Sequence, residues 1–144
     1  SESVGFTGKT FYIWANPKKD PTPPKPIKNL TVKVEGEKAT VTFTAPADEG
    51  GGKVIRYQVK YSDKPIVSYQ DFLKLWAKNQ DAKHCNWWMA VNLTGEPTPK
   101  APGQKETFVV TGLNEDIAAK YFAVRSFDDS NNRSSVSNVA QPGK

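Results

Sequence analysis

Cysteine is almost absent from this sequence, in which Cys85 is the only one among 144 residues. A single thiol cannot form an intrachain disulfide, so the fold must be stabilised by packing alone. The lone cysteine also argues against a structural zinc site. Zinc takes four protein ligands, or three and a water, whereas Cys85 has only His84 beside it. We therefore predict no metal ligand and no cofactor.

Long apolar runs are absent as well. No stretch approaches the roughly eighteen residues that span a membrane, and no apolar segment follows a basic start as in a signal peptide. We therefore expect no membrane insertion. Residues 1–4 look like a cut point, so an export signal would lie upstream or would have been removed.

Groups for nucleophilic catalysis are equally scarce. His84 is the only histidine, and no recognisable serine or cysteine elbow accompanies it. Cys85 is its sequence neighbour, which is not the geometry of a catalytic dyad. The carboxylate pairs at 48–49 and 128–129 are expected in turns, where they accept main-chain hydrogen bonds. We predict no catalytic residue and no enzymatic activity.

The net charge of +5 comes from dispersed lysines and not from a basic run. The sequence contains no basic cluster and no aromatic–glycine motif of the kind that binds nucleic acid. A solvated basic surface is the better interpretation, and we expect no nucleic-acid partner.

The sequence does contain stretches in which polar and apolar side chains alternate. In residues 54–62, polar side chains fall on one side of an extended backbone and apolar ones on the other. Glycines at positions 50–52 precede this stretch and allow a sharp turn. The pattern predicts a half-buried antiparallel strand whose core face carries Ile55, Tyr57, Val59 and Tyr61.

The same alternation predicts further strands on both sides. Residues 30–34 and 39–43 are expected to form a hairpin, and later strands are expected at 107–111, 120–127 and 133–140. Their inward side chains would include Phe108, Val110, Phe122 and Val124. About seven short strands at this spacing are typical of a β-sandwich.

The N-terminal part differs in composition. Residues 1–16 hold an aromatic cluster that predicts one short strand, and residues 17–26 carry five prolines that favour stiff, extended backbone. We interpret 17–26 as a linker and 27–141 as the main domain. Two interpretations of 1–16 stay open: the tail of a preceding domain, or a strand that folds back onto the main sheet.

Residues 63–105 are much too long for a hairpin connection, and such insertions are usually functional or carry their own structure. Within them, Ser68 is a plausible N-cap and Asp71 lies in the first turn of a predicted helix at 69–79. The helix is indicated by the i, i+3, i+4, i+7 spacing of Tyr69, Phe72, Leu73 and Trp76.

Aromatic residues of the insertion suggest two alternatives. Flat aromatic faces can stack on sugar rings, so Trp87 with Trp76 or Tyr69 would form a glycan-binding platform. Alternatively, Trp88 and Val91 belong to a fourth strand and are buried together with Trp76, because large aromatics in a small domain are usually core residues.

Taken together, these segments resemble the fibronectin type III family, in its bacterial extracellular form, over about residues 24–141. The motifs that carry the resemblance are the turn at 46–51, the strand motifs at 57–62, 110–113 and 121–125, and residues 134–138. A segment similar to 95–103 precedes the fifth strand in that form. Two positions depart from the family: Phe43 replaces its buried tryptophan, and Lys120 stands where its corner tyrosine is expected, with Tyr121 one residue late.

The resemblance implies an all-β fold, a seven-stranded antiparallel immunoglobulin-like sandwich, here with a short helix in the insertion. It also implies a non-catalytic accessory or spacer module of a secreted or cell-surface bacterial protein, attached to a carbohydrate-active or other extracellular enzyme. Its partners would be neighbouring domains of the same polypeptide. The alternative function is a carbohydrate-binding or protein-adhesion module that uses aromatic residues of the insertion.

Three sequences fit the acceptor pattern for N-linked glycosylation. They begin at Asn29, Asn92 and Asn132. The pattern carries no information for a bacterial protein.

Overall fold

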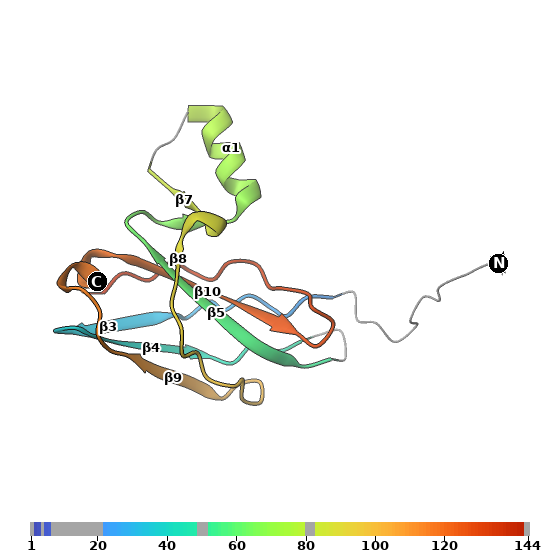
Figure 1. Cartoon of the computed structure of the whole chain (residues 1–144), viewed down its shortest axis with the longest axis horizontal. Helices are drawn as coiled ribbons and strands as arrows, with labels where there is room; N and C mark the ends of the chain where they lie inside the picture. Colours follow the sequence, from blue (N-terminus) through green and yellow to red (C-terminus); the bar gives the residue numbers. More distant parts are fainter. Residues whose placement is uncertain (1, 4, 7–21, 49–51, 80–82, 143–144) are drawn as a thin grey trace.

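The computed structural model of the chain describes residues 2–3, 5–6, 22–48, 52–79 and 83–142, and this part is mostly β-structure with one α-helix (Figure 1). The helix α1 covers Tyr69–Asn79, and the short 3₁₀ helices η1 and η2 cover Trp87–Met89 and Glu115–Ala119. The strands are β1 (Glu2–Ser3), β2 (Gly5–Phe6), β3 (Thr31–Glu35), β4 (Lys38–Thr44), β5 (Val54–Ser62), β6 (Ile66–Val67), β7 (Cys85–Asn86), β8 (Val91–Asn92), β9 (Lys105–Val110) and β10 (Tyr121–Asp128).

Six of these strands form two antiparallel sheets that pack face to face. One sheet has the strand order β3-β4-β9 and the other has the order β10-β5-β8 (Figure 1). The β3–β4 hairpin turns at Gly36, whose φ of 61° lies in the left-handed region that favours glycine. The predicted hairpin is therefore confirmed.

Alternating side chains from both sheets make the core. Val59 of β5 is fully buried, as are Val41 and Phe43 of β4. The rings of Phe43 and Tyr57 meet edge to face with their centroids 4.8 Å apart. Phe43 therefore fills the core at the position where the resemblance expects a tryptophan. Burying one such side chain stabilises the fold by about 1.5–3 kcal/mol.

One residue of β5 departs from the predicted alternation. The register between β10 and β5 shifts between Phe127 and Asp128, and the shift leaves Ile55 in a β-bulge. The bulge turns Ile55 outward, where it is 44% exposed, while Val54 packs against the core. The prediction that Ile55 lies in the core is therefore wrong.

The last segment, 133–140, runs beside β10 but is not a regular strand. It meets β10 at isolated bridges near its two ends. Between the bridges, the hydroxyls of Ser134 and Ser137 accept hydrogen bonds from the main-chain amides of Ser126 and Val124 at 3.0 and 2.8 Å. The prediction of a regular strand at 133–140 is therefore wrong, because serine hydroxyls replace part of the main-chain pairing.

The proline-rich segment contacts the sandwich near its C-terminal end, where Pro24 forms an isolated bridge with Asp48. β1 and β2 pair in parallel with each other. The remainder of the strand expected within 1–16, and the linker residues 17–21, lie outside the described residues. The predicted division of the chain at these points stays a prediction.

Candidate functional site on the insertion

The insertion leaves the sheet after β5 and returns to it at β8. Within it, β6 pairs in parallel with β7. Figure 1 shows α1 and β7 projecting from one side of the sandwich. β8 then pairs with β5 through Lys60–Asn92 and Tyr61–Val91. The projecting helix is therefore flanked on both sides by segments that rest on the sheet.

Trp87 anchors the insertion to the sandwich. Its side chain is fully buried, at 0% exposure, in a second apolar cluster with Ile66, Ala90 and Ala123. Ala123 lies between the inward Phe122 and Val124 and so points to the outer face of β10, where the insertion covers it completely. A fully buried indole cannot stack on a sugar ring. The prediction that Trp87 contributes to a glycan platform is therefore wrong.

The alternative, in which Trp88 and Val91 are buried together with Trp76, is wrong in its burial, because the three are 52%, 51% and 50% exposed. Val91 does lie on a strand, β8, whereas Trp88 lies on η1. The reason lies at Asn86, whose side-chain oxygen accepts a hydrogen bond from the main-chain amide of Trp88 at 2.9 Å. This cap starts the 3₁₀ helix η1. The helical turn changes the phase of the side chains ahead of β8, and in this phase Trp87 points inward and Trp88 points outward.

Lys60 is the buried cation beneath Trp87. It is 4% exposed, and its Nζ donates a hydrogen bond to the main-chain oxygen of Trp87 at 2.8 Å. The same nitrogen lies 4.8 Å from the ring centroid of Trp87 and 5.5 Å from that of Trp88. Burial, and then the charge of Arg125, lower the pKa of the Lys60 ammonium, while Cys85 acts in the opposite direction.

Two arginines stack on the same tryptophans. The guanidinium carbon of Arg125 lies 5.3 Å from the Trp87 ring centroid, and that of Arg133 lies 4.6 Å from the Trp88 centroid. Burial, and then the charge of Arg133, lower the pKa of the Arg125 guanidinium. We call the resulting set the tryptophan–cation layer; it comprises Lys60, Trp87, Trp88, Arg125 and Arg133.

The helix α1 begins at a cap formed by Ser68. The Ser68 hydroxyl accepts a hydrogen bond from the main-chain amide of Asp71 at 3.1 Å, and its carbonyl accepts one from the amide of Phe72 at 2.8 Å. The Asp71 carboxylate also lies in the first turn, where it complements the helix dipole. The predicted helix and its cap are confirmed.

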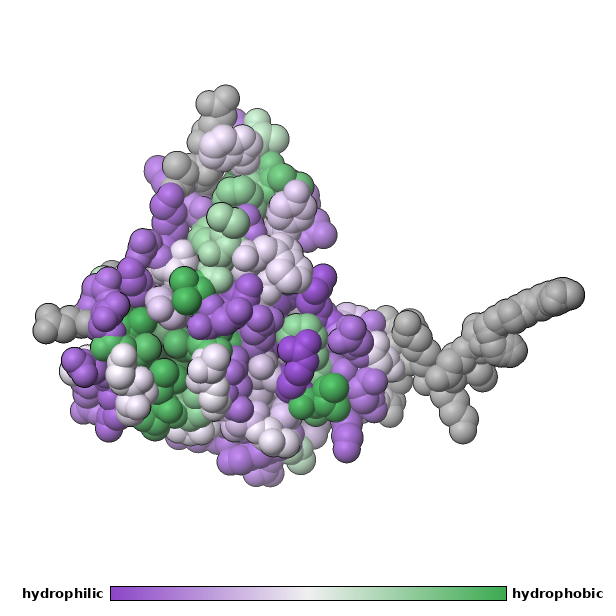
Figure 2. Space-filling model, viewed as in Figure 1, coloured by the Kyte–Doolittle hydropathy of each residue, from purple (hydrophilic) through white to green (hydrophobic). Residues whose placement is uncertain are grey.

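One side of α1 is an exposed apolar surface. Tyr69, Leu73 and Trp76 are 46%, 47% and 50% exposed, and their i, i+4, i+7 spacing places them on one face. We call these three residues the apolar stripe. Figure 2 shows apolar and neutral surface over the projecting helix. The half-buried Phe72 stacks on Trp76 with ring centroids 6.4 Å apart.

His84 and Cys85 line a shallow hollow beside α1 of about 270 Å³, together with Phe72 and Met89. In the part of the chain that the structure describes, no group of three or more His, Cys, Asp or Glu residues could hold a metal ion. No helix among those residues is both long enough and apolar enough to cross a membrane.

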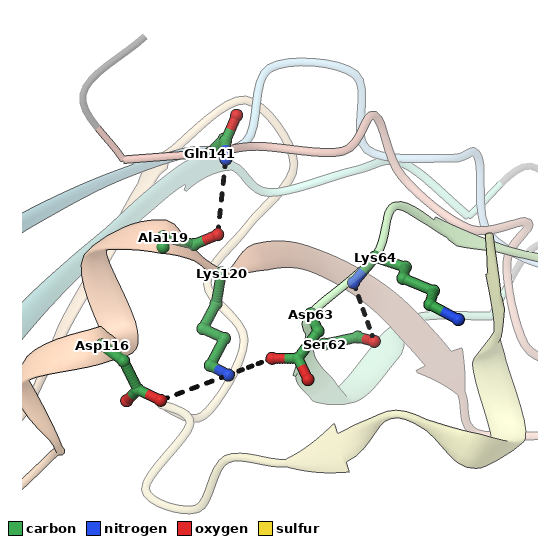
Figure 3. Close-up of polar contacts among 7 residues, drawn as sticks. All are labelled: Ser62, Asp63, Lys64, Asp116, Ala119, Lys120 and Gln141. Atoms are coloured by element: carbon green, nitrogen blue, oxygen red, sulfur yellow. Dashed lines mark hydrogen bonds and ion pairs between the residues drawn. The ribbon is translucent and has the colours of Figure 1, made fainter. Parts of the chain in front are cut away.

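An ion pair links Asp63, the first residue of the insertion, to the sandwich. Lys120, which follows η2, forms ion pairs with Asp63 and, at 3.4 Å, with Asp116 (Figure 3). The hydrogen bond to Asp63 is the main cause of a raised pKa of the Lys120 ammonium, and partial burial opposes it. At the position where the resemblance expects a corner tyrosine, this chain therefore places an ion pair.

The predicted ligand-binding residues do not form one site. Tyr69 and Trp76 share the apolar stripe, whereas Trp87 lies in the buried cluster. Sequence reasoning missed the stacking of Lys60 and Arg125 on the tryptophans. A signal was available, because Lys60 falls on the polar side of the strand predicted at 54–62 and Arg125 follows the inward Val124. Both cations therefore face outward, where an insertion rich in tryptophan could cover them.

No family model matches this chain. A human protein, calcium-activated chloride channel regulator 4, is 34% identical over an alignment of 129 residues, and the match covers 87% of this chain and 12% of that protein. The chain thus spans about an eighth of the length of the relative. The relative is human, and the predicted bacterial source stays a prediction.

Solved structures from titin are similar in fold. The crystal structure of titin domains A168–A170 has a TM-score of 0.50 and 16% identity, and the match covers 83% of this chain and 31% of that one. Titin module A71 from human cardiac muscle has a TM-score of 0.49 and 18% identity, with 83% and 90% covered. The likeness to A168–A170 shows the fold alone: the chain is an immunoglobulin-like or fibronectin-like β-sandwich, which confirms the predicted fold class at that level.

Proposed function

We propose that this chain is a fibronectin type III-like module of a longer secreted or cell-surface protein, in which it has no catalytic role. Its task is to present α1 to a neighbouring domain of the same polypeptide. The observation that carries this proposal is the apolar stripe, three large exposed side chains on a helix that projects from the sandwich.

The arrangement of the strands supports the fibronectin type III assignment. β3, β4 and β9 form one sheet, and β8, β5 and β10 form the other, with residues 133–140 alongside β10. Counting that last segment, seven extended segments among the described residues surround the core, in keeping with the sandwich that the sequence resembles.

The position of α1 supports a presenting role. A helix of 11 residues is marginal on its own in water, so its stability must come from packing. On this chain the packing comes from the rest of the insertion, which the fully buried Trp87 holds against β5 and β10. Large apolar residues that remain exposed on such a supported element usually mark an interaction surface.

The relationship to calcium-activated chloride channel regulator 4 supports a place within a longer polypeptide, because the match covers 12% of that protein. We propose that the module serves a longer protein of that kind. A spacer that also docks onto its neighbour accounts for the sandwich and for the apolar stripe together.

Hydrogen exchange on the full-length protein tests this proposal. Leu73→Glu places a charge in the apolar stripe and is expected to speed amide exchange in α1 and in the domain that covers it. Lys74→Glu is the matched control, because Lys74 is the adjacent exposed residue and lies off the stripe. If Leu73→Glu left exchange unchanged, the docking role would be wrong.

Glycan binding is the second candidate function, because Tyr69 and Trp76 expose aromatic faces on the same side of α1. This candidate glycan site does not include Trp87, which is buried. Calorimetry with neutral oligosaccharides would show heat of binding that Trp76→Ala abolishes and that Trp88→Ala, a change at an exposed tryptophan outside the stripe, preserves. An absence of binding heat with the unmodified protein would eliminate this candidate.

A further inference from the structure

The three acceptor sequences for N-linked glycosylation differ sharply in the exposure and the hydrogen bonding of their side chains. A glycan is a bulky, hydrophilic group on the side-chain nitrogen of asparagine, and it needs a surface position with that nitrogen open to solvent. We propose that Asn92 carries an N-linked glycan, in preference to Asn29 and Asn132. The inference rests on the secreted or cell-surface location proposed above and on a eukaryotic source, as in the human relative, because the acceptor pattern carries no information for a bacterial protein.

Asn92 has the geometry that a glycan requires. It lies on β8, at the edge of the β10-β5-β8 sheet, and both it and Thr94 of the acceptor sequence are exposed. Its Oδ1 accepts a hydrogen bond from the side-chain amide of Gln58 at 2.8 Å. The amide group is planar, so this bond directs Nδ2 away from Gln58. Nδ2 has no hydrogen-bond partner among the described residues.

Asn29 uses both ends of its amide within the fold. Its Nδ2 donates to Thr44 Oγ1 at 2.7 Å, and its Oδ1 accepts from the main-chain amide of Thr44 at 3.0 Å. These two bonds hold the nitrogen against the end of β4. A sugar on that nitrogen would have to displace or crowd the contact with Thr44.

The third acceptor sequence is folded into the turn after β10. Asn132 is half-buried and its Nδ2 donates to Asp128 Oδ2 at 3.1 Å. Ser134, the hydroxyl residue of this sequence, is fully buried and donates to the main-chain oxygen of Ser135 at 2.9 Å. A chain modified at Asn132 would have to fold with a glycan beside this buried turn.

A glycan at Asn92 also has a physical consequence. In the described part of the chain, β8 is an edge strand with β5 as its only sheet neighbour. Exposed strand edges are templates for pairing with other chains. A hydrophilic glycan on β8 would cover that edge and prevent such pairing.

Site mapping on the secreted protein tests the proposal. The unmodified sequence, given an added secretion signal and expressed in mammalian cells, is treated with the amidase that converts a glycosylated asparagine to aspartate, and the sites are read by mass spectrometry. Most secreted chains are expected to carry a glycan at Asn92, and Asn132 is expected to be unmodified. An Asn92 without a glycan would overturn the proposal, whether or not Asn132 carries one.

Variants give a second measurement. Asn92→Gln and Thr94→Ala are each expected to remove this glycan, whereas Thr94→Ser keeps it, because a hydroxyl remains in the acceptor sequence. Asn29→Gln should leave it in place. The added signal brings the chain to the glycosylation machinery whatever its natural location. Failure at Asn92 therefore refutes the site alone, and absence of the natural protein from the secretory route refutes the proposed location alone.

Discussion

The side-chain nitrogen of Lys60 donates a hydrogen bond to the main-chain oxygen of Trp87 at 2.8 Å, across 27 residues of sequence. Lys60 belongs to β5 and Trp87 belongs to η1, so this bond joins the sheet directly to the insertion that covers it. Both residues are buried. The contact is one point at which the insertion rests on the sheet.

The two tryptophans are expected to differ strongly when they are removed. Trp87→Ala should lower the free energy of unfolding by about 3–5 kcal/mol, because it opens a cavity in a packed cluster. Trp87→Phe should cost much less, since Nε1 of Trp87 has no hydrogen-bond partner among the described residues. Trp88→Ala removes an exposed side chain and its cation–π contacts with Lys60 and Arg133, each worth about 0.5–1 kcal/mol. Urea unfolding of the three variants checks this, and equal losses for both alanine variants would contradict it.

Lys60→Met is expected to leave a stable fold, because methionine keeps the apolar stem and removes the buried charge. The sign of the pH effect follows from the lowered pKa of Lys60. In the window below its ordinary value of 10.5, the unfolded state binds more protons than the folded state, so the stability of the unmodified protein rises with pH.

The difference in unfolding free energy between the unmodified protein and Lys60→Met isolates this group from the others that titrate. That difference should shift in favour of the unmodified protein as the pH increases toward 10.5. A difference that is flat with pH would show that Lys60 titrates alike in both states.

Tyr57 and Glu106 form a buried polar pair in which the Tyr57 hydroxyl donates to Glu106 Oε2 at 2.7 Å. Tyr57→Phe should cost about 1.5–3 kcal/mol at neutral pH, as expected for a hydrogen bond to a charged group. Burial, and then the hydrogen bond and charge of Glu106, raise the pKa of Tyr57 above its ordinary value of 10.0. Above that pH the unfolded state loses a proton that the folded state keeps, so stability falls as the pH rises.

The free energy of unfolding measured at alkaline pH checks the Tyr57 prediction. It should fall less steeply with pH in Tyr57→Phe than in the unmodified protein, because the variant lacks the Tyr57 phenol. Tyr61→Phe is the control: Tyr61 is half-buried, and its hydroxyl makes no hydrogen bond among the described residues. Equal effects of the two substitutions would argue against a special role for the Glu106 contact.

Lys120→Met is expected to have a small effect on stability, about 0.2–1 kcal/mol, although Lys120 forms two ion pairs. The side chains of Asp63 and Asp116 are 76% and 64% exposed, so water and salt screen both pairs. The pKa of Lys120 is raised, so its contribution is fully present below pH 10.5 and is lost as the pH rises through the folded value. Unfolding at low and high salt measures it; a loss that is large and independent of salt would contradict the prediction.

The sequence by itself determined the elements whose signals are local. The alternation around Val41 and Phe43 predicts a strand because neighbouring side chains of an extended backbone point to opposite faces. The spacing of the apolar stripe, with Ser68 as cap, predicts α1 because a helix brings residues three and four apart together. Both signals lie within a few residues of the element that they predict.

Only the tertiary structure decided which of these side chains became buried. Ile55 lies outside the core because of a register shift against β10, a strand about seventy residues away in the chain, and bulges of this kind are set by pairing. Trp87 rather than Trp88 is buried because one turn of helix changes the phase of the chain as the insertion meets the sheet. Lys60 is buried because that insertion folds over the outer face of β5. Each outcome depends on contacts between distant residues, which no local pattern contains.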